Sequence, residues 1–175
     1  MSELVSQTIA DLFADLPDRA RVWVYCTDRA LTESEADVVN SGLKRFLASW
    51  KSHGRTIHGA GSIVLGRFVV IAGDIPGGDV SGCGIDASTR TLNTIAGELG
   101  FGFLSALDAA YRIGNEPVKT VSRAEMKKLV SQGALSHDTR VFDFSVPDLG
   151  RVRAGTFDPV LRDSWYARFL GAEAN

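Results

Sequence analysis

The sequence has few cysteines, no basic cluster and no long hydrophobic run. Its two cysteines, Cys26 and Cys83, are too few for a disulfide-stapled scaffold. No run of Lys or Arg is longer than the pair at 127–128, and the formal net charge is −2, so binding to the phosphates of nucleic acid is not expected. No apolar stretch approaches the roughly 20 residues of a membrane span, so membrane insertion is not expected either.

The first residues also lack the marks of a secretory signal. They contain no basic segment before the apolar positions and no small-residue cleavage site. Together with the low cysteine content, this predicts a protein of the reducing cytoplasm. The 175 residues suffice for one sizeable core with a small appended unit, and 45% apolar with 23% charged residues is ordinary for a globular chain.

Apolar residues at helical spacing, together with capping residues, predict the helices. Thr32 and Glu35 have the spacing of a capping box, in which hydroxyl and carboxylate each bond a free helix amide, and the pattern recurs at 122–125. Asp86 is a good N-cap and Gly100 a good stop for another helix. The helices are expected at 3–15, 32–52, 86–99 and 123–132, with a terminal one at 161–169.

Runs of β-branched and aromatic residues predict the strands. Two apolar runs that meet at 66–67 predict a hairpin with a type II′ turn. Pairing Leu65 with Phe68 in that turn places His58 near Ile75. Both faces of the hairpin are apolar, so both are expected to be covered. Other strands are expected at 21–26, 107–112, 141–146 and 152–157.

The order of these elements predicts an α+β fold. From 21 to 112 the order β-α-β-β-α-β is that of the ferredoxin-like split βαβ sandwich. We therefore expect an amphipathic helix in residues 1–20, a ferredoxin-like core in 21–115, and a C-terminal helix–hairpin unit in 116–175 that packs on the core.

A glycine-rich segment that leads into the 86–99 helix is the main candidate site. Its backbone amides and the helix dipole could hold an anion or a partner, although Asp79 and Asp86 would repel a phosphate. It is not a P-loop, because no G-x-x-x-x-G-K-[ST] occurs in the chain. The candidate ligand-binding residues are Gly77, Gly78, Ser81, Gly82, Cys83 and Asp86.

Cys83 in this segment is also a candidate nucleophile. A helix N-terminus can lower the pKa of a thiol, and the hairpin register brings His58 to the same end of the sheet as a candidate base. The nearby carboxylates of Asp74, Asp79 and Asp86 oppose this activation, and a small residue that fills a tight turn is the simpler interpretation. No H-x-x-x-H or C-x-x-C spacing occurs, so neither a metal nor another cofactor is expected.

Residues 78–92, G-D-V-S-G-C-G-I-D-A-S-T-R-T-L, resemble the S-G-C-S-I-D-x-S motif of an uncharacterised family of small bacterial proteins found among Bacteroidetes and their relatives. The W-V-Y at Trp23, D-T-x-V-F at 138–142 and D-S-W at 163–165 resemble the same family. Gly84 stands where that motif usually has Ser. The resemblance implies no established activity.

Residues 121–142 are similar to the helix-and-strand half of GYF-like peptide-binding modules, with a capped helix, a glycine stop, D-T-x-V and an aromatic.

The first hypothesis is a non-catalytic binding or regulatory protein for an unknown protein or small-molecule partner. It would use residues 77–86, or the sheet face and the C-terminal unit, and a homodimer remains open. The alternative is a thiol-dependent enzyme with Cys83 as nucleophile and His58 as base.

Overall fold

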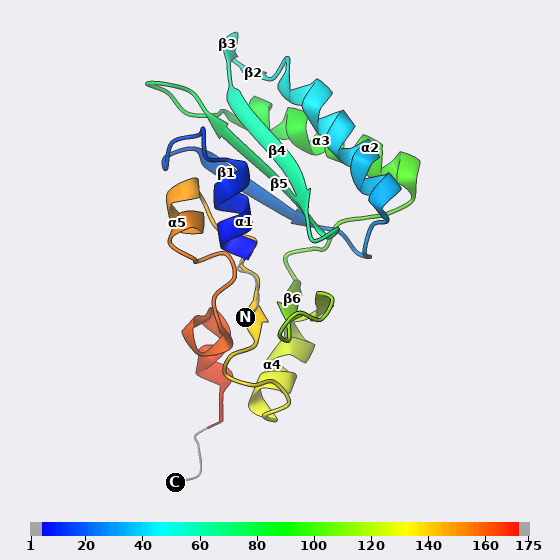
Figure 1. Cartoon of the computed structure of the whole chain (residues 1–175), viewed down its shortest axis with the longest axis vertical. Coiled ribbons are helices and arrows are strands. Elements are labelled where there is room, and N and C mark those ends of the chain that lie inside the picture. Colours follow the sequence, from blue (N-terminus) through cyan, green and yellow to red (C-terminus); the bar gives the residue numbers. More distant parts are fainter. Residues whose placement is uncertain (1–4, 172–175) are drawn as a thin grey trace.

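The computed structural model describes residues 5–171, as an α+β arrangement of helices and small antiparallel sheets (Figure 1). The predicted α+β class is confirmed. The elements are α1 (Val5–Leu12), β1 (Arg21–Cys26), α2 (Glu33–Leu47), β2 (Lys51–Ser52), β3 (Arg55–Thr56), β4 (His58–Val64), β5 (Phe68–Asp74), α3 (Gly82–Leu99), β6 (Asp108–Arg112), β7 (Lys119–Ser122), α4 (Arg123–Ser131), β8 (Arg140–Val141), α5 (Leu149–Arg153) and the 3-10 helices η1 (Leu161–Asp163) and η2 (Trp165–Phe169).

Three antiparallel strands form the first sheet, in the order β1-β5-β4. β5 lies between the other two strands and is buried along its whole length. One face of the sheet packs against α2 and α3, and the other packs against α1 and C-terminal segments (Figure 1). The expectation that both faces of the hairpin are covered is therefore confirmed.

The hairpin between β4 and β5 turns one residue earlier than predicted. Val64, not Leu65, lies opposite Phe68. Leu65 and Gly66 have positive φ angles of 53° and 61°, as in a primed turn, and Arg67 N closes the turn on Val64 O at 3.1 Å. The predicted register is wrong by one residue, because a leucine takes a left-handed position that the prediction assigned to glycine alone.

The strand predicted at 107–112 forms as β6, but it pairs in a second sheet of order β7-β6-β8. On the edge away from β5, β1 forms one isolated β-bridge near each end. Its start pairs with Asp148, and the residue after its last one pairs with Phe103. After Phe103 the chain turns away, and the turn is closed by a 2.7 Å bond from Ser105 N to Asp108 Oδ2. Within residues 5–171, three of the four strands of the expected ferredoxin-like core share one sheet, and the fourth does not join them.

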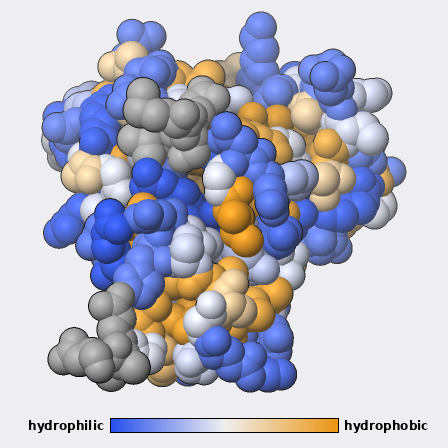
Figure 2. All heavy atoms as spheres, turned by 60° about the horizontal axis from the view of Figure 1, so that its bottom comes forward, coloured by the Kyte–Doolittle hydropathy of each residue, from blue (hydrophilic) through white to orange (hydrophobic). Residues whose placement is uncertain are grey.

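The C-terminal part departs from the predicted helix–hairpin unit. α4 packs on β6 through buried Met126 and Val130, but β8 ends at Val141. No strand forms at 152–157, because Asp148 caps a short helix there, α5. The chain then returns beside β8, where Val141 N donates to Pro159 O at 3.0 Å. Figure 2, turned to bring this end of the molecule forward, shows hydrophobic atoms gathered beside the C-terminal segment.

Several predicted helices have different ends. α2 has the expected capping box at Thr32 and Glu35, but it ends at Leu47 and not at 52. α1 ends at Leu12, and residues 3–4 of its predicted span lie outside the described residues. The predicted terminal helix forms as two short 3-10 helices, η1 and η2. No helix in the described part of the chain is long and apolar enough to cross a membrane.

A cluster of phenylalanines joins the C-terminal part to the first sheet. Phe68 at the start of β5 has its ring centroid 4.5 Å from that of Phe142 and 5.4 Å from that of Phe157. Phe68 and Phe157 have no exposed surface, and Phe142 is 5% exposed. Burial of each such ring contributes roughly 1.5–3 kcal/mol, so this contact fixes the C-terminal part on the core.

Asp158 is 1% exposed and caps α1 from the far end of the chain. Its carboxylate accepts hydrogen bonds from Val5 N at 2.7 Å, from Ser6 N at 3.1 Å, and from the Ser6 hydroxyl. The first amides of a helix have no partners within the helix and carry its positive dipole end, so a carboxylate is stabilising there. These bonds join the first helix to the segment that returns beside β8.

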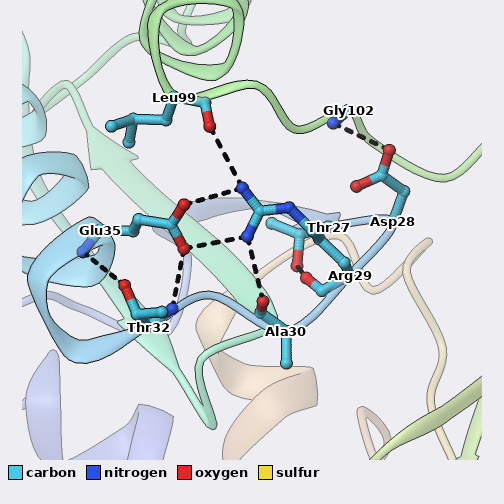
Figure 3. A network of polar contacts seen from close by, with 8 residues as sticks. All are labelled: Thr27, Asp28, Arg29, Ala30, Thr32, Glu35, Leu99 and Gly102. Carbon is cyan, nitrogen blue, oxygen red and sulfur yellow. Dashed lines mark hydrogen bonds and ion pairs between the residues drawn. The ribbon is translucent and has the colours of Figure 1, made fainter.

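A second polar network joins the end of β1 to α2 and α3 (Figure 3). Arg29 donates to both carboxylate oxygens of Glu35, at 2.9 and 2.7 Å, and to the carbonyl of Leu99 at 3.1 Å. The hydrogen bond from Arg29, followed by the one from the Thr32 amide, lowers the pKa of Glu35 from 4.5 to about 2. The network thus holds the start of α2 against the end of α3.

We predict that Asp158→Ala lowers the free energy of unfolding by about 1–3 kcal/mol, because it leaves buried amides of α1 without an acceptor. Urea unfolding followed by circular dichroism measures this loss. The exposed Asp15, changed to Ala, is the matched control and should alter stability by less than about 0.5 kcal/mol. Equal unfolding midpoints for the two variants would contradict the capping role.

Glu35→Gln should destabilise the protein in a pH-dependent way. The folded pKa of Glu35 is lowered from 4.5 to about 2, so its stabilising effect is complete above 4.5 and is lost as the pH falls towards 2. The difference in urea midpoint between wild type and Glu35→Gln should shrink over this range. Glu33→Gln, in the same helical turn, serves as control. A difference that stays constant from pH 7 to below pH 3, or grows on acidification, would show that Arg29 does not hold the carboxylate.

Candidate functional site

In the glycine-rich segment, the helix begins earlier than predicted. α3 starts at Gly82 with Ser81 as its N-cap, and Ile85 N donates to Ser81 O at 3.1 Å. Asp86 is therefore an exposed residue within α3 and not its cap, which corrects the prediction. Cys83 lies in the first turn of the helix and is exposed.

Much of this segment is bonded to neighbouring parts of the same chain. The Ser81 hydroxyl bonds that of Ser52 at 2.6 Å, and Arg55 donates to Pro76 O at 2.6 Å. A Cβ added at Gly78 would lie 2.6 Å from the Arg55 guanidinium. Polar groups that would line an anion site are thus partly used within the protein, while Gly77, Gly82 and Cys83 remain exposed.

His58 and Cys83, the predicted base and nucleophile, lie in two different elements, β4 and α3. His58 is the exposed first residue of β4 and lies opposite Asp74, one residue before the Ile75 that the predicted register gave. Asp74 is 7% exposed and bonds Arg19 at 2.9 Å. Within residues 5–171 no hydrogen bond joins His58 to Cys83. Those residues also contain no group of three His, Cys, Asp or Glu that could hold a metal ion.

A cleft of about 1010 Å³ lies in the C-terminal part of the molecule, away from the glycine-rich segment that supplied the candidate site residues. Its sides come from the turn before β6, from β8 and the loop after it, and from the segment that runs from the end of α5 to η2. A volume of this size is at the upper end of the range for small-molecule pockets and accommodates several side chains. We refer to this space as the cleft.

The cleft has aromatic and apolar surfaces beside polar groups. Phe142, Phe144, Trp165 and Tyr166 line it, and the Trp165 side chain is prominent because 49% of its surface is exposed. Burial raises the pKa of Tyr166, and the positive charge of Arg123, which also lines the cleft, acts in the opposite direction. Figure 2 shows this end of the molecule, with hydrophobic atoms bordered by hydrophilic ones.

Local hydrogen bonds fix two of the carboxylates in the cleft. Asp108 accepts from Ser105 N at 2.7 Å, and Asp143 accepts from Ser145 N at 2.8 Å, so each carboxylate holds a turn. Arg140 also lines the cleft and donates to the main-chain oxygen of Asp158 at 2.9 Å, which leaves its positive charge without a carboxylate bond in the described residues.

Two basic side chains lie beside the indole ring of Trp165, which lines the cleft. The guanidinium carbon of Arg168 lies 4.0 Å from its ring centroid, within the range of a cation–π contact. Lys127 Nζ, from α4, lies 5.4 Å from the Trp165 centroid and 5.1 Å from that of Phe169. Arg168 lies in η2 with Trp165, whereas Lys127 comes from α4, so this group of side chains forms only in the fold.

No protein-family model matches the sequence, no curated protein matches it, and no solved structure matches its fold. Function is therefore inferred from the chemistry of the residues themselves.

Cys83 and Cys26 should differ sharply in reactivity. Both thiols are free, but only Cys83 is exposed, while burial raises the pKa of Cys26 to about 11. Iodoacetamide should therefore label Cys83 in the folded protein and Cys26 only in urea, as measured by mass spectrometry of the peptides. The Cys83→Ser variant, the control, should remain unlabelled without urea. Rapid labelling of native Cys26 would contradict the packing of β1.

Proposed function

We propose that the protein is a non-catalytic binding protein that holds an extended peptide segment in the cleft. The observation that carries this proposal is the cleft itself, with about 1010 Å³ of space, aromatic walls and a few fixed polar groups. Ligand sites in proteins combine apolar surface with a small number of oriented polar groups in this way. Exposed aromatic side chains beside a groove are also the usual means of holding an extended peptide.

The resemblance of residues 121–142 to GYF-like peptide-binding modules supports the same proposal. Their predicted helix and strand are present as α4 and β8. Arg123 at the start of α4 and Arg140 and Val141 of β8 all line the cleft. The segment that carries the resemblance therefore supplies part of the wall of the space that could hold a peptide.

The alternative is a thiol-dependent enzyme with Cys83 as nucleophile and His58 as base. The exposed thiol in the first turn of α3 is the observation in its favour. Two observations favour the binding hypothesis. Asp74 forms a salt bridge with Arg19, and in the described residues no hydrogen bond joins His58 to Cys83.

The finer fold and the cellular setting are proposals as well. The strand order β1-β5-β4, with α2 and α3 on one face, is that of a split βαβ unit, so we place the core among ferredoxin-like sandwiches that lack the fourth strand. The motif around Cys83 supports membership of the uncharacterised small bacterial family. The few cysteines support a cytoplasmic protein, and a homodimer remains open.

Selection of random linear peptides on the full-length protein tests the proposal. A selected peptide should shift the amide NMR signals of residues around the cleft, and Trp165→Ala should weaken its binding by about tenfold or more, because an exposed aromatic anchor is lost. Val38→Ala, an exposed apolar side chain on α2, is the control and should leave affinity unchanged.

Two results would overturn this function. Shifts confined to residues 77–86 would transfer the site to the glycine-rich segment. Peptides that bind wild type and Trp165→Ala equally well would show that the cleft is not the binding site.

A further inference from the structure

Three basic side chains lie near Trp165 or Tyr166, two aromatic residues that line the cleft. Arg168 stacks on the indole at 4.0 Å, and Lys127 lies 5.4 Å from the same ring. Arg123 is four residues before Lys127 on α4, so the two share one helix face, and Arg123 lies near Tyr166. All three basic residues are exposed. We refer to Arg123, Lys127 and Arg168 as the basic rim.

The charges of the basic rim are not neutralised within the described part of the chain. No salt bridge there joins any of the three to a carboxylate. Neighbouring charges differ in this respect: Lys128 is 3.9 Å from Glu125, and Arg162 is bonded to Asp138. The basic rim is therefore a local excess of positive charge on a chain whose formal net charge is −2.

This arrangement is electrostatically unfavourable in the free protein. Like charges four residues apart on a helix repel one another, and Arg168 is held near them by its contact with Trp165. A cation–π contact fixes the position of a cation without cancelling its charge. The carboxylates of Asp108, Asp143 and Asp163 line the cleft and keep their negative charges, but in the described residues none of them forms a salt bridge with the basic rim.

We propose that the peptide bound by the cleft is acidic, with Asp or Glu side chains that meet the basic rim and an apolar side chain that packs beside Trp165. This inference rests on the proposed peptide-binding function and specifies its ligand. Charge complementarity at a binding margin gives specificity and speeds association. A nucleic acid fits less well, because three cations neutralise too few phosphates for strong binding.

Selection of random peptides on the full-length protein also tests this inference. The enriched peptides should be rich in Asp and Glu, and their affinity should fall as sodium chloride is added. Lys127→Glu should weaken binding of an enriched peptide by about fivefold to tenfold, as expected for reversal of an exposed ion pair. Lys128→Glu makes the same change of charge next to it on α4, but at a lysine already paired with Glu125, and should leave the affinity unchanged. A peptide with Lys in place of the critical acidic residue should bind Lys127→Glu better than it binds wild type.

Each other outcome has a defined meaning. Neutral or proline-rich peptides that shift signals around the cleft and depend on Trp165 would overturn the acidic ligand and leave the peptide-binding function intact. No enrichment over beads without protein, or enriched peptides that bind away from the cleft, would overturn both proposals. Competition by oligothymidylate that exceeds competition by the acidic peptide would replace the peptide ligand with single-stranded nucleic acid.

Discussion

The bond between the buried carboxylate of Asp158 and the first amides of α1 is the constraint on which the cleft depends. A buried charge is tolerated only when it is well bonded, and here Val5 N, Ser6 N and the Ser6 hydroxyl supply the donors. Pro159 and Val160, which follow Asp158 directly, line the cleft, and Arg140 reaches the Asp158 main-chain oxygen from β8. One wall of the cleft therefore takes its position from a helix 152 residues away in sequence. The C-terminal part resembles a small module, but its candidate site belongs to the whole chain.

Sequence reasoning located the local elements well and their non-local pairing poorly. The capping box at Thr32 and the glycine stop at Gly100 are present, because both depend on contacts between near neighbours. The register at Val64 and Phe68 was missed, because two turns compatible with the same residues differ in which of them takes a positive φ. β6 was predicted within about one residue, yet its sheet was not, since pairing with β7 or with β1 buries the same apolar side chains.

Packing explains one glycine of the glycine-rich segment, Gly84, together with two glycines of the neighbouring strands. Trp50 is 2% exposed and lies against backbone on several sides. A Cβ built on Gly59 or Gly73 would lie 2.8 Å from its ring, and its indole nitrogen donates to Gly84 O at 2.9 Å. Gly84, the position that departs from the family motif, is also close to Val80, at 3.0 Å from an added Cβ. Packing around Trp50 therefore accounts for Gly59, Gly73 and Gly84, whereas a Cβ added at Gly77 or Gly82 would meet nothing within 4 Å.

The cleft shows the opposite case, in which residues that are inconspicuous in the sequence form a candidate site once the chain is folded. Its lining comes from four separate stretches, near 105–109, 123, 140–145 and 154–166, which lie far apart in the sequence and meet only in the fold. Lys127 and Arg168 are ordinary surface residues in the sequence and become a paired feature only when α4 and η2 place both beside Trp165. A charge becomes informative when the fold leaves it held in place and without a partner, because keeping like charges together has an energetic cost that a bound anion would remove. Within residues 5–171 the basic rim meets that condition, and it adds to the space and aromatic walls of the cleft as support for the proposed binding there.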